Sequence, residues 1–361
     1  MSTAKQRLRL GLIDGDGIGP EVVRAARSVV DEALSVAGAT PVEWVPLLMG
    51  RRAIEEFGTP LPEPTLQTLE GLDAWVLGPH DNASYPAEHR RGVAPGGAIR
   101  KHFGLYANIR PARAFTGVRA SAPDIDLVIV RENSEGFYAD RNMFAGSGEF
   151  RPTPDVAMAV GVVTRRACEL IAHEAFRLAS ARRKKVTIVH KANVLPMTMG
   201  LFRDVCYEIA HAYPGIRVED AHVDAMAAHL VRAPGEFDVV VTENLFGDIL
   251  SDLAGELSGS LGMAPSLNCS ATRAMAQAVH GAAPTLAGHN RANPVALQLS
   301  AAMLLNWLGT RDSDPALVHA GERIEHAVAA TFEAGIATAD LGGMASTSEF
   351  TEQICARVHR R

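Results

Sequence analysis

Residues 11–22 read GLIDGDGIGPEV, an apolar run that ends in three alternating glycines and continues into a helix-forming stretch. Glycine-rich turns from a strand into a helix are typical of dinucleotide-binding proteins, in which the turn approaches a pyrophosphate. That fingerprint places its third glycine three residues after the second, and an acidic residue about 20 positions further on. Here Gly19 follows Gly17 by only two residues. The stretch therefore predicts a tight turn between a strand and a helix that is not a Rossmann fingerprint.

Short apolar runs with the β-branched composition of buried strands recur outward from this turn. They are LRLGLI, DAWVLG, DLVIVRE, KVTIVHK and FDVVVTEN. Helical patterns, with apolar residues three and four apart, fall between them at residues 19–36, 165–181 and 294–308. This alternation predicts an α/β fold with a large, mostly parallel twisted sheet flanked by helices. The polar, Gly- and Pro-rich residues 140–154 predict an exposed arm or hairpin.

Composition narrows the class of protein. The 361 residues are 47% hydrophobic and 21% charged, which is typical of a folded protein of about two domains. A net charge of -6 disfavours nucleic-acid binding. The four cysteines are scattered without a C-x-x-C pair, as in a cytoplasmic protein with reduced thiols. Neither an export signal nor a membrane span is expected, because no apolar run reaches about 18 residues.

Five further motifs follow the glycine turn in order. They are RENSEGFY at 131–138, HKANVLPMTMGLF at 190–202, FDVVVTENLFGDILSDL at 237–253, HGAAPTLAGHNRANP at 280–294 and DLGGMASTSEF at 340–350. With DGDGIGPEV, they make nearly the whole chain resemble the metal-dependent isocitrate and isopropylmalate dehydrogenase family. The resemblance implies the isopropylmalate dehydrogenase-like two-domain fold and a homodimer with shared active sites. It implies a large cofactor-binding domain at 1–104 plus 257–361, and a small substrate and dimerisation domain at 105–256 with an arm near 140–160.

Three aspartates are the candidate metal ligands. Asp248 and Asp252 are four residues apart, which on a helix places both carboxylates on one face. Carboxylate-only ligation favours Mg²⁺ or Mn²⁺ over zinc. The resemblance implies that Asp224, Asp248 and Asp252 bind the metal together, with Asp224 supplied by the second subunit of the dimer.

Three arginines are candidates for binding the carboxylates of a small substrate, because guanidinium groups bind carboxylates through two parallel hydrogen bonds. Arg131 follows the strand LVIV, so it is expected at the carboxyl end of a strand, where ligands bind in open α/β sheets. The resemblance implies that Arg100, Arg110 and Arg131 hold the carboxylates of a malate.

Tyr138 and Lys191 are the candidate acid/base pair. Side chains of these types titrate near pH 10, so acid/base work near neutral pH needs a neighbouring cation or burial. In the family, the lysine comes from the second subunit and assists removal of the 2-hydroxyl proton, while the tyrosine protonates C3 after decarboxylation. Asp248 either relays a proton or only ligates the metal, and the sequence does not separate these roles.

The candidate cofactor residues come from the same resemblance. They are Asn193, Gln277, His280, Gly281, Thr285, Leu286 and Asn293. NAD-using relatives carry an aspartate where this chain has Thr285, and NADP-using relatives carry lysine and tyrosine where it has Thr285 and Leu286. His289 and Arg291 are near enough in sequence to compensate a 2′-phosphate. NAD is therefore the expected cofactor, with NADP as the alternative.

The substrate is a 3-substituted (2R)-malate in this interpretation, and 3-isopropylmalate is the first candidate. Homoisocitrate, isocitrate, tartrate and malate are the alternatives, because Gly96 and Gly97 stand where relatives carry the residues that recognise the C3 substituent. The glycines predict a pocket that is open or takes a substituent of unknown shape. A catalytically silent regulatory paralogue is the alternative of another class, and it predicts losses among the site residues that this chain does not show. A generic nucleotide-binding module lacks its phosphate-binding fingerprint.

Overall fold

The computed structural model describes residues 8–90 and 93–360. Within these residues, ten strands form one sheet in the order β2-β1-β3-β12-β11-β4-β5-β10-β8-β9. Six of the nine neighbouring pairs are parallel, which confirms the expected α/β fold with a mostly parallel sheet. The strands are β1 Leu8–Ile13, β2 Val42–Leu47, β3 Ala74–Leu77, β4 Ala107–Arg113, β5 Asp126–Glu132, β8 Lys185–His190, β9 Arg217–His222, β10 Val239–Thr242, β11 Leu267–Cys269 and β12 Ala274–Gln277.

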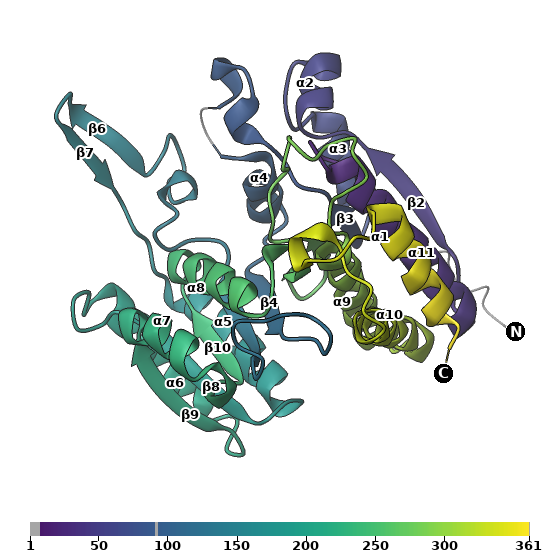
Figure 1. The fold of residues 1–361 in the computed structure, drawn as a ribbon. Coiled ribbons are helices and arrows are strands. Elements are labelled where there is room, and N and C mark those ends of the chain that lie inside the picture. Colours follow the sequence, from purple (N-terminus) through teal and green to yellow (C-terminus); the bar gives the residue numbers. More distant parts are fainter. Residues whose placement is uncertain (1–7, 91–92, 361) are drawn as a thin grey trace, which may run out of the picture.

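Helices cover both faces of this sheet (Figure 1). The three helical patterns in the sequence correspond to α1, α5 and α9. The helices are α1 Gly19–Ala37, α2 Arg51–Phe57, α3 Glu63–Glu70, α4 Pro95–His102, α5 Arg165–Ser180, α6 Thr198–Ala210, α7 Val223–Arg232, α8 Asn244–Leu257, α9 Val295–Arg311, α10 Pro315–Glu333 and α11 Thr347–Val358. In the part of the chain that is described, no helix combines the length and the apolar character needed to cross a membrane.

Strand direction reverses in the middle of the sheet. β11 pairs antiparallel with both β12 and β4, and β4 pairs antiparallel with β5. On either side, the strands β2-β1-β3-β12 and β5-β10-β8-β9 form two parallel blocks. The first block draws on both ends of the chain and the second on its centre. The division into domains at 1–104 plus 257–361 and 105–256 stays a prediction.

Alternation along β5 assigns the two faces of the second block. Val128 and Val130 pack in the core cluster that contains the apolar face of α5. Leu127 and Ile129 pack in the cluster that contains residues of α7 and α8. Arg131 continues the second series, and Arg110 on β4 lies opposite Ile129 in the register. Both arginines therefore face α8.

A separate hairpin is formed by β6 Glu149–Thr153 and β7 Val156–Ala159, which pair antiparallel. It lies in the segment expected to form an arm, and in Figure 1 it projects away from the main sheet. Every residue of the two strands is exposed, including the large apolar side chains Phe150, Val156 and Met158. A two-stranded hairpin without a packed face is marginally stable on its own, and these side chains form an exposed apolar surface.

The glycine turn that opens the chain's first helix is a packing junction. Gly15 and Gly17 have φ angles of 71° and 58°, and a Cβ on either would overlap a backbone carbonyl, that of Pro79 or Ala282. Between the glycines, the Asp16 N–H donates to the Pro79 carbonyl at 2.7 Å. The turn therefore holds the loop after β3 and the loop after β12 in place, in agreement with the expectation of a tight turn.

Candidate active site

Three side chains donate to the Asp248 carboxylate, and Asp252 joins them through Arg110. These residues form what we call the Asp248 cluster (Arg110, Arg131, Tyr138, Asp248 and Asp252). Nη1 of Arg110 donates to Oδ1 of Asp248 at 3.0 Å and to Oδ1 of Asp252 at 3.4 Å. The Arg131 guanidinium and the Tyr138 hydroxyl also donate to Asp248. The structure thus brings together two of the predicted substrate arginines, one predicted catalytic residue and two predicted metal ligands.

The start of α8 sets the position of these carboxylates. Glu243 caps the helix by accepting from the N–H groups of Leu245 at 3.0 Å and Phe246 at 2.7 Å. Gly247 leaves space for the stem of Arg131, because a Cβ there would lie 2.6 Å from the arginine Cγ. Asp248 and Asp252 follow one turn apart, on the helix face that meets β4 and β5.

Sequence reasoning missed two polar groups that orient the arginines. Asn244 accepts from Nε of Arg131 at 2.9 Å and from Nη2 at 2.7 Å. Ser251 accepts from Nη1 of Arg110 at 2.7 Å. Both lie in the motif TENLFGDILSDL. Asn244 is four residues before Asp248 and Ser251 is three residues after it, and this spacing could have placed all three on one helix face.

The charges within the cluster determine its protonation. Burial opposes ionisation of Asp248, but Arg131 and Arg110 outweigh it and hold the pKa of this carboxyl below its ordinary value. Burial and the contact with Asp248 raise the pKa of Tyr138. Burial, with Arg131 adding to it, lowers the pKa of Arg110 to about 10. Near neutral pH, Asp248 is a carboxylate and Tyr138 is a phenol that can donate its proton.

Lys191 and Asp224 form a second, separate pair. Nζ of Lys191 donates to Oδ1 of Asp224 at 2.5 Å, and this pair lies at the end of β8 and the start of α7. Over residues 8–90 and 93–360, no group of three His, Cys, Asp or Glu side chains is placed to hold a metal ion. Within the described residues, one chain therefore does not assemble Asp224 with Asp248 and Asp252. That Asp224 serves a site in another subunit stays a prediction.

Arg100, the third predicted substrate arginine, lies on α4. Its Nη2 donates to Oε1 of Gln277 at 2.8 Å, which places the predicted cofactor residue Gln277 beside a predicted substrate residue. Gln277 ends β12 and lies next to Leu77 of β3 in the register. Arg100 therefore reaches the carboxyl ends of two parallel strands, the edge at which ligands bind in open α/β sheets.

Four of the predicted cofactor residues line a cavity of about 640 Å³, namely His280, Gly281, Leu286 and Asn293. This volume is within the range of small-molecule sites. Nδ1 of His280 lies 3.0 Å from the Gly281 carbonyl, and its Nε2 is buried without a hydrogen-bond partner. Burial lowers the pKa of His280, so the ring is neutral near pH 7. Its orphaned nitrogen fits a polar ligand such as an adenine or a ribose.

The other predicted cofactor residues lie outside this cavity. Thr285 is exposed on the same loop but does not line the cavity, and Asn193 is exposed beside Lys191. The Asp340 carboxylate and the Arg291 guanidinium both line it. Asp340 accepts from Nδ2 of Asn293 at 3.0 Å. A carboxylate in the wall disfavours a 2′-phosphate, while Arg291 is the cation that would attract one.

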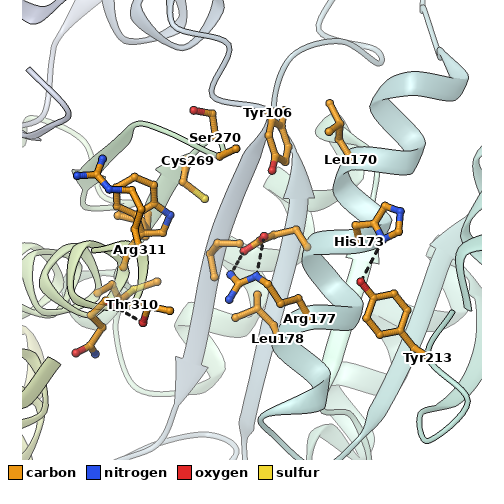
Figure 2. Close-up of a pocket in the computed structure, with 17 residues that line it drawn as sticks. Tyr106, Leu170, His173, Arg177, Leu178, Tyr213, Cys269, Ser270, Thr310 and Arg311 are labelled. Atoms are coloured by element: carbon orange, nitrogen blue, oxygen red, sulfur yellow. Dashed lines mark hydrogen bonds and ion pairs between the residues drawn. The ribbon is translucent and has the colours of Figure 1, made fainter. Parts of the chain in front are cut away.

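A second cavity, of about 570 Å³, lies on the face of the sheet opposite the Asp248 cluster (Figure 2). Figure 2 shows Tyr106 between the side chains of α5, such as His173, and the end of α9 at Arg311. Ile109 of β4 lines this cavity, whereas its neighbour Arg110 faces α8. The sheet therefore separates this cavity from the Asp248 cluster, and no predicted site residue lines it.

An α/β sheet with buried arginines and carboxylates gathered beside α8, in a chain that also has a cavity of small-molecule size, fits an enzyme that acts on a small acid. Residues 9–354 match the isocitrate/isopropylmalate dehydrogenase family, and the chain belongs to this family. Family membership confirms the resemblance seen in the sequence and establishes an oxidoreductase of the decarboxylating hydroxyacid dehydrogenase type.

Relatives with different names are similar to this chain over nearly its full length. The isocitrate/homoisocitrate dehydrogenase of Thermus thermophilus is 44% identical over 96% of this chain and 97% of its own length. The 3-isopropylmalate dehydrogenase of Archaeoglobus fulgidus is 40% identical over 96% of this chain and 98% of its own length. The crystal structure of isocitrate dehydrogenase from Methylococcus capsulatus is 40% identical and superposes with a TM-score of 0.85, covering 98% of this chain and 100% of that chain.

Proposed function

We propose that the protein catalyses the NAD-dependent and Mg²⁺- or Mn²⁺-dependent oxidative decarboxylation of a 3-substituted (2R)-malate. The observation that carries this proposal is the Asp248 cluster, in which two buried arginines and a tyrosine hydroxyl meet one ionised carboxylate. Two guanidinium groups beside one carboxylate leave donor capacity for a substrate carboxylate. The relatives named for isocitrate, homoisocitrate and isopropylmalate act, by those names, on acids of this type.

Each side chain has a role that follows from its position. Arg110, Arg131 and Arg100 bind the carboxylates of the malate and orient its C2–C3 bond. The Tyr138 phenol donates a proton to C3 after the carboxylate has left. Asp248 and Asp252 have the oxygen donors that a hard divalent cation requires. When bound, such a cation supplies Lewis-acid stabilisation of the negative charge that develops on the C2 oxygen.

Lys191 and Asp224 complete the site of a second copy of the chain in this proposal, and the functional unit is a homodimer. The support is the exposed apolar surface beside Lys191 and beside Asp248. Val194 and Met197, just after Lys191, are 62% and 84% exposed, and Ile249, next to Asp248, is 58% exposed. Large apolar side chains clustered around polar site residues mark a protein interface more often than a free surface. Lys191 from the partner then assists removal of the 2-hydroxyl proton.

NAD is the proposed cofactor because its adenosine half fits the cavity around His280. Nε2 of His280 offers a partner to the adenine or ribose, and Asp340 offers acceptors for ribose hydroxyls. Arg291 is the residue that makes NADP the alternative to be tested.

The test is a turnover assay that follows reduction of the nicotinamide in the presence of Mn²⁺. It crosses NAD and NADP with 3-isopropylmalate, homoisocitrate, isocitrate, tartrate and malate. Turnover that is abolished by EDTA and restored by Mn²⁺ is the expected result. Absence of turnover with every pair, by protein that is folded and dimeric, would contradict the proposal and favour a silent regulatory paralogue.

A further inference from the structure

The histidine that follows β3 was not among the residues considered from the sequence. Leu77 ends β3 and lies beside Gln277 in the register, so His80, three residues later, emerges at the same edge as the side chain that accepts from Arg100. This is the carboxyl edge of parallel strands, where ligands bind in this kind of sheet.

The imidazole lies over helix α4. A Cβ on Gly96 would be 2.7 Å from Cε1 of His80, 3.3 Å from its Nε2 and 3.6 Å from its Nδ1. The distances to Cε1 and Nε2 are short and the distance to Nδ1 is that of an ordinary van der Waals contact, so the Cε1–Nε2 edge of the ring covers this residue. Gly96 and Arg100 are four residues apart and share one helix face. The imidazole therefore lies beside the position that the sequence associates with the C3 substituent. The expectation of a pocket that is open or takes a substituent of unknown shape stays a prediction.

The ring is held firmly and is neutral. Asp16 in the glycine turn accepts from the N–H of Asp81 at 2.9 Å and from the Tyr85 hydroxyl at 2.5 Å, which anchors the loop that follows the histidine. Burial, reinforced by Arg100, lowers the pKa of His80 to about 4, although Asp16 and Asp81 act in the opposite direction. Nδ1 of this neutral ring is buried and has no hydrogen-bond partner.

A buried polar nitrogen without a partner is destabilising, and it is rare unless a ligand supplies the partner. We propose that His80 is a specificity-determining residue that hydrogen-bonds to an oxygen atom of the C3 substituent of the substrate. The substituent is therefore a hydroxyl or carries a carboxylate, as in tartrate, isocitrate or homoisocitrate, and it is not the isopropyl group. The inference rests on the proposed function, because it requires that Arg100 binds the same malate.

The physical basis of this specificity is the high free-energy cost of binding a substrate that lacks the oxygen with which the protein would hydrogen-bond. A site that hydrogen-bonds a substrate oxygen strongly rejects an analogue without it, because the protein group is left unpaired and dry. An isopropyl group beside Nδ1 of His80 would leave the nitrogen in this state. An oxygen at the same place supplies the missing partner, and the imidazole selects the tautomer that donates to it.

The experiment compares two substitutions of similar size. His80→Leu keeps much of the volume but removes the hydrogen bond, while His80→Asn keeps a polar nitrogen near the position of Nδ1. The measured quantity is the ratio of kcat/KM for the best oxygen-bearing substrate to kcat/KM for 3-isopropylmalate. We expect this ratio to fall at least about tenfold in His80→Leu and less than about threefold in His80→Asn. The matched control is His102→Ala, an exposed histidine of α4 that lies 2.9 Å from Glu70 and should leave the ratio unchanged.

A second readout does not depend on turnover. Each acid, added with Mn²⁺, should raise the Tm of the wild type if it binds, and the shift by the oxygen-bearing acid should shrink in His80→Leu. A wild type that prefers 3-isopropylmalate, or a ratio that does not change in His80→Leu, would overturn the inference while leaving the reaction class intact. A wild type that binds these acids in a His80-dependent way but never reduces nicotinamide would instead refute the proposed function.

Discussion

At the scale of single residues, the role of the Tyr138 hydroxyl can be tested most directly. It donates to Asp248, and burial raises its pKa, so it holds its proton throughout the neutral range. Removing only the oxygen in Tyr138→Phe should lower kcat about 100-fold, because the proton donor to C3 is lost. KM should change much less, since Arg110 and Arg131 remain. Steady-state kinetics separates these two effects, and an unchanged kcat would remove Tyr138 from the mechanism.

His80 also makes a prediction about stability and pH. An unfolded histidine titrates near 6.5, whereas the folded-state pKa of His80 is about 4. Above pH 6.5 this histidine is neutral in both states, so its lowered pKa does not affect the free energy of unfolding. As the pH falls from 6.5 toward 4, the unfolded chain binds a proton at this histidine and the folded protein does not, so the folded protein loses stability. At pH 5, this loss amounts to at most about 2 kcal/mol.

Urea unfolding of the wild type and of His80→Leu at pH 7 and pH 5 measures this loss. We expect the wild type to lose more stability between the two pH values than the variant does. Equal losses in the two proteins would show that the imidazole takes up its proton equally well in the folded and unfolded states.

At the scale of elements, the glycine turn is a junction between loops. Gly17→Ala should destabilise the protein and weaken dinucleotide binding, because its Cβ would collide with the Ala282 carbonyl in the loop that carries His280. Gly38→Ala is the matched control, since its φ of 66° imposes the same backbone strain but nothing lies within 4 Å of the new Cβ. Strain alone costs about 1 kcal/mol.

The comparison is made by thermal unfolding and by the KM for the dinucleotide. Gly17→Ala should exceed the control in loss of Tm and raise the KM for the dinucleotide several-fold, whereas Gly38→Ala should leave that KM as it is. Equal effects of the two substitutions would show that the collision with Ala282 is relieved without cost.

Three long helices with a full apolar period were predictable, whereas both edge strands and the central strands β4, β11 and β12 were not. The patterns at 19–36, 165–181 and 294–308 fall within a few residues of the bounds of α1, α5 and α9. β2 and β9 escaped detection because each is an edge strand with one neighbour, and neither has a fully buried residue to mark it in the sequence. A strand that is half exposed does not carry a continuous apolar run.

At the scale of the whole molecule, shared active sites make a quantitative prediction. Lys191→Ala and Asp248→Asn remove groups from the two separate clusters of one chain, so each variant alone should be inactive. If the site takes Lys191 from one subunit and Asp248 from the other, a mixed dimer has one intact site and one doubly altered site. Refolding the two variants together in equal amounts should restore about a quarter of wild-type activity, by the statistics of random pairing.

The control refolds each variant by itself, which should restore nothing, and size-exclusion chromatography verifies that all samples are dimeric. Absence of complementation in a mixture that contains mixed dimers would mean that Lys191 and Asp248 act within one chain. The turnover assay should also show loss of activity in a monomeric variant. This variant carries Phe150→Asp and Met158→Asp in the exposed hairpin.

The sequence by itself determined the α/β class, the family and most members of the Asp248 cluster. These features are encoded locally, in apolar periods and in motifs such as TENLFGDILSDL, where helix geometry fixes which side chains share a face. Only the tertiary structure decided that the glycine turn supports two loops, that Gln277 binds Arg100 and that His80 covers Gly96. These contacts join residues from 16 to 265 positions apart, whose meeting depends on the order of strands in the sheet, and no local pattern carries that order.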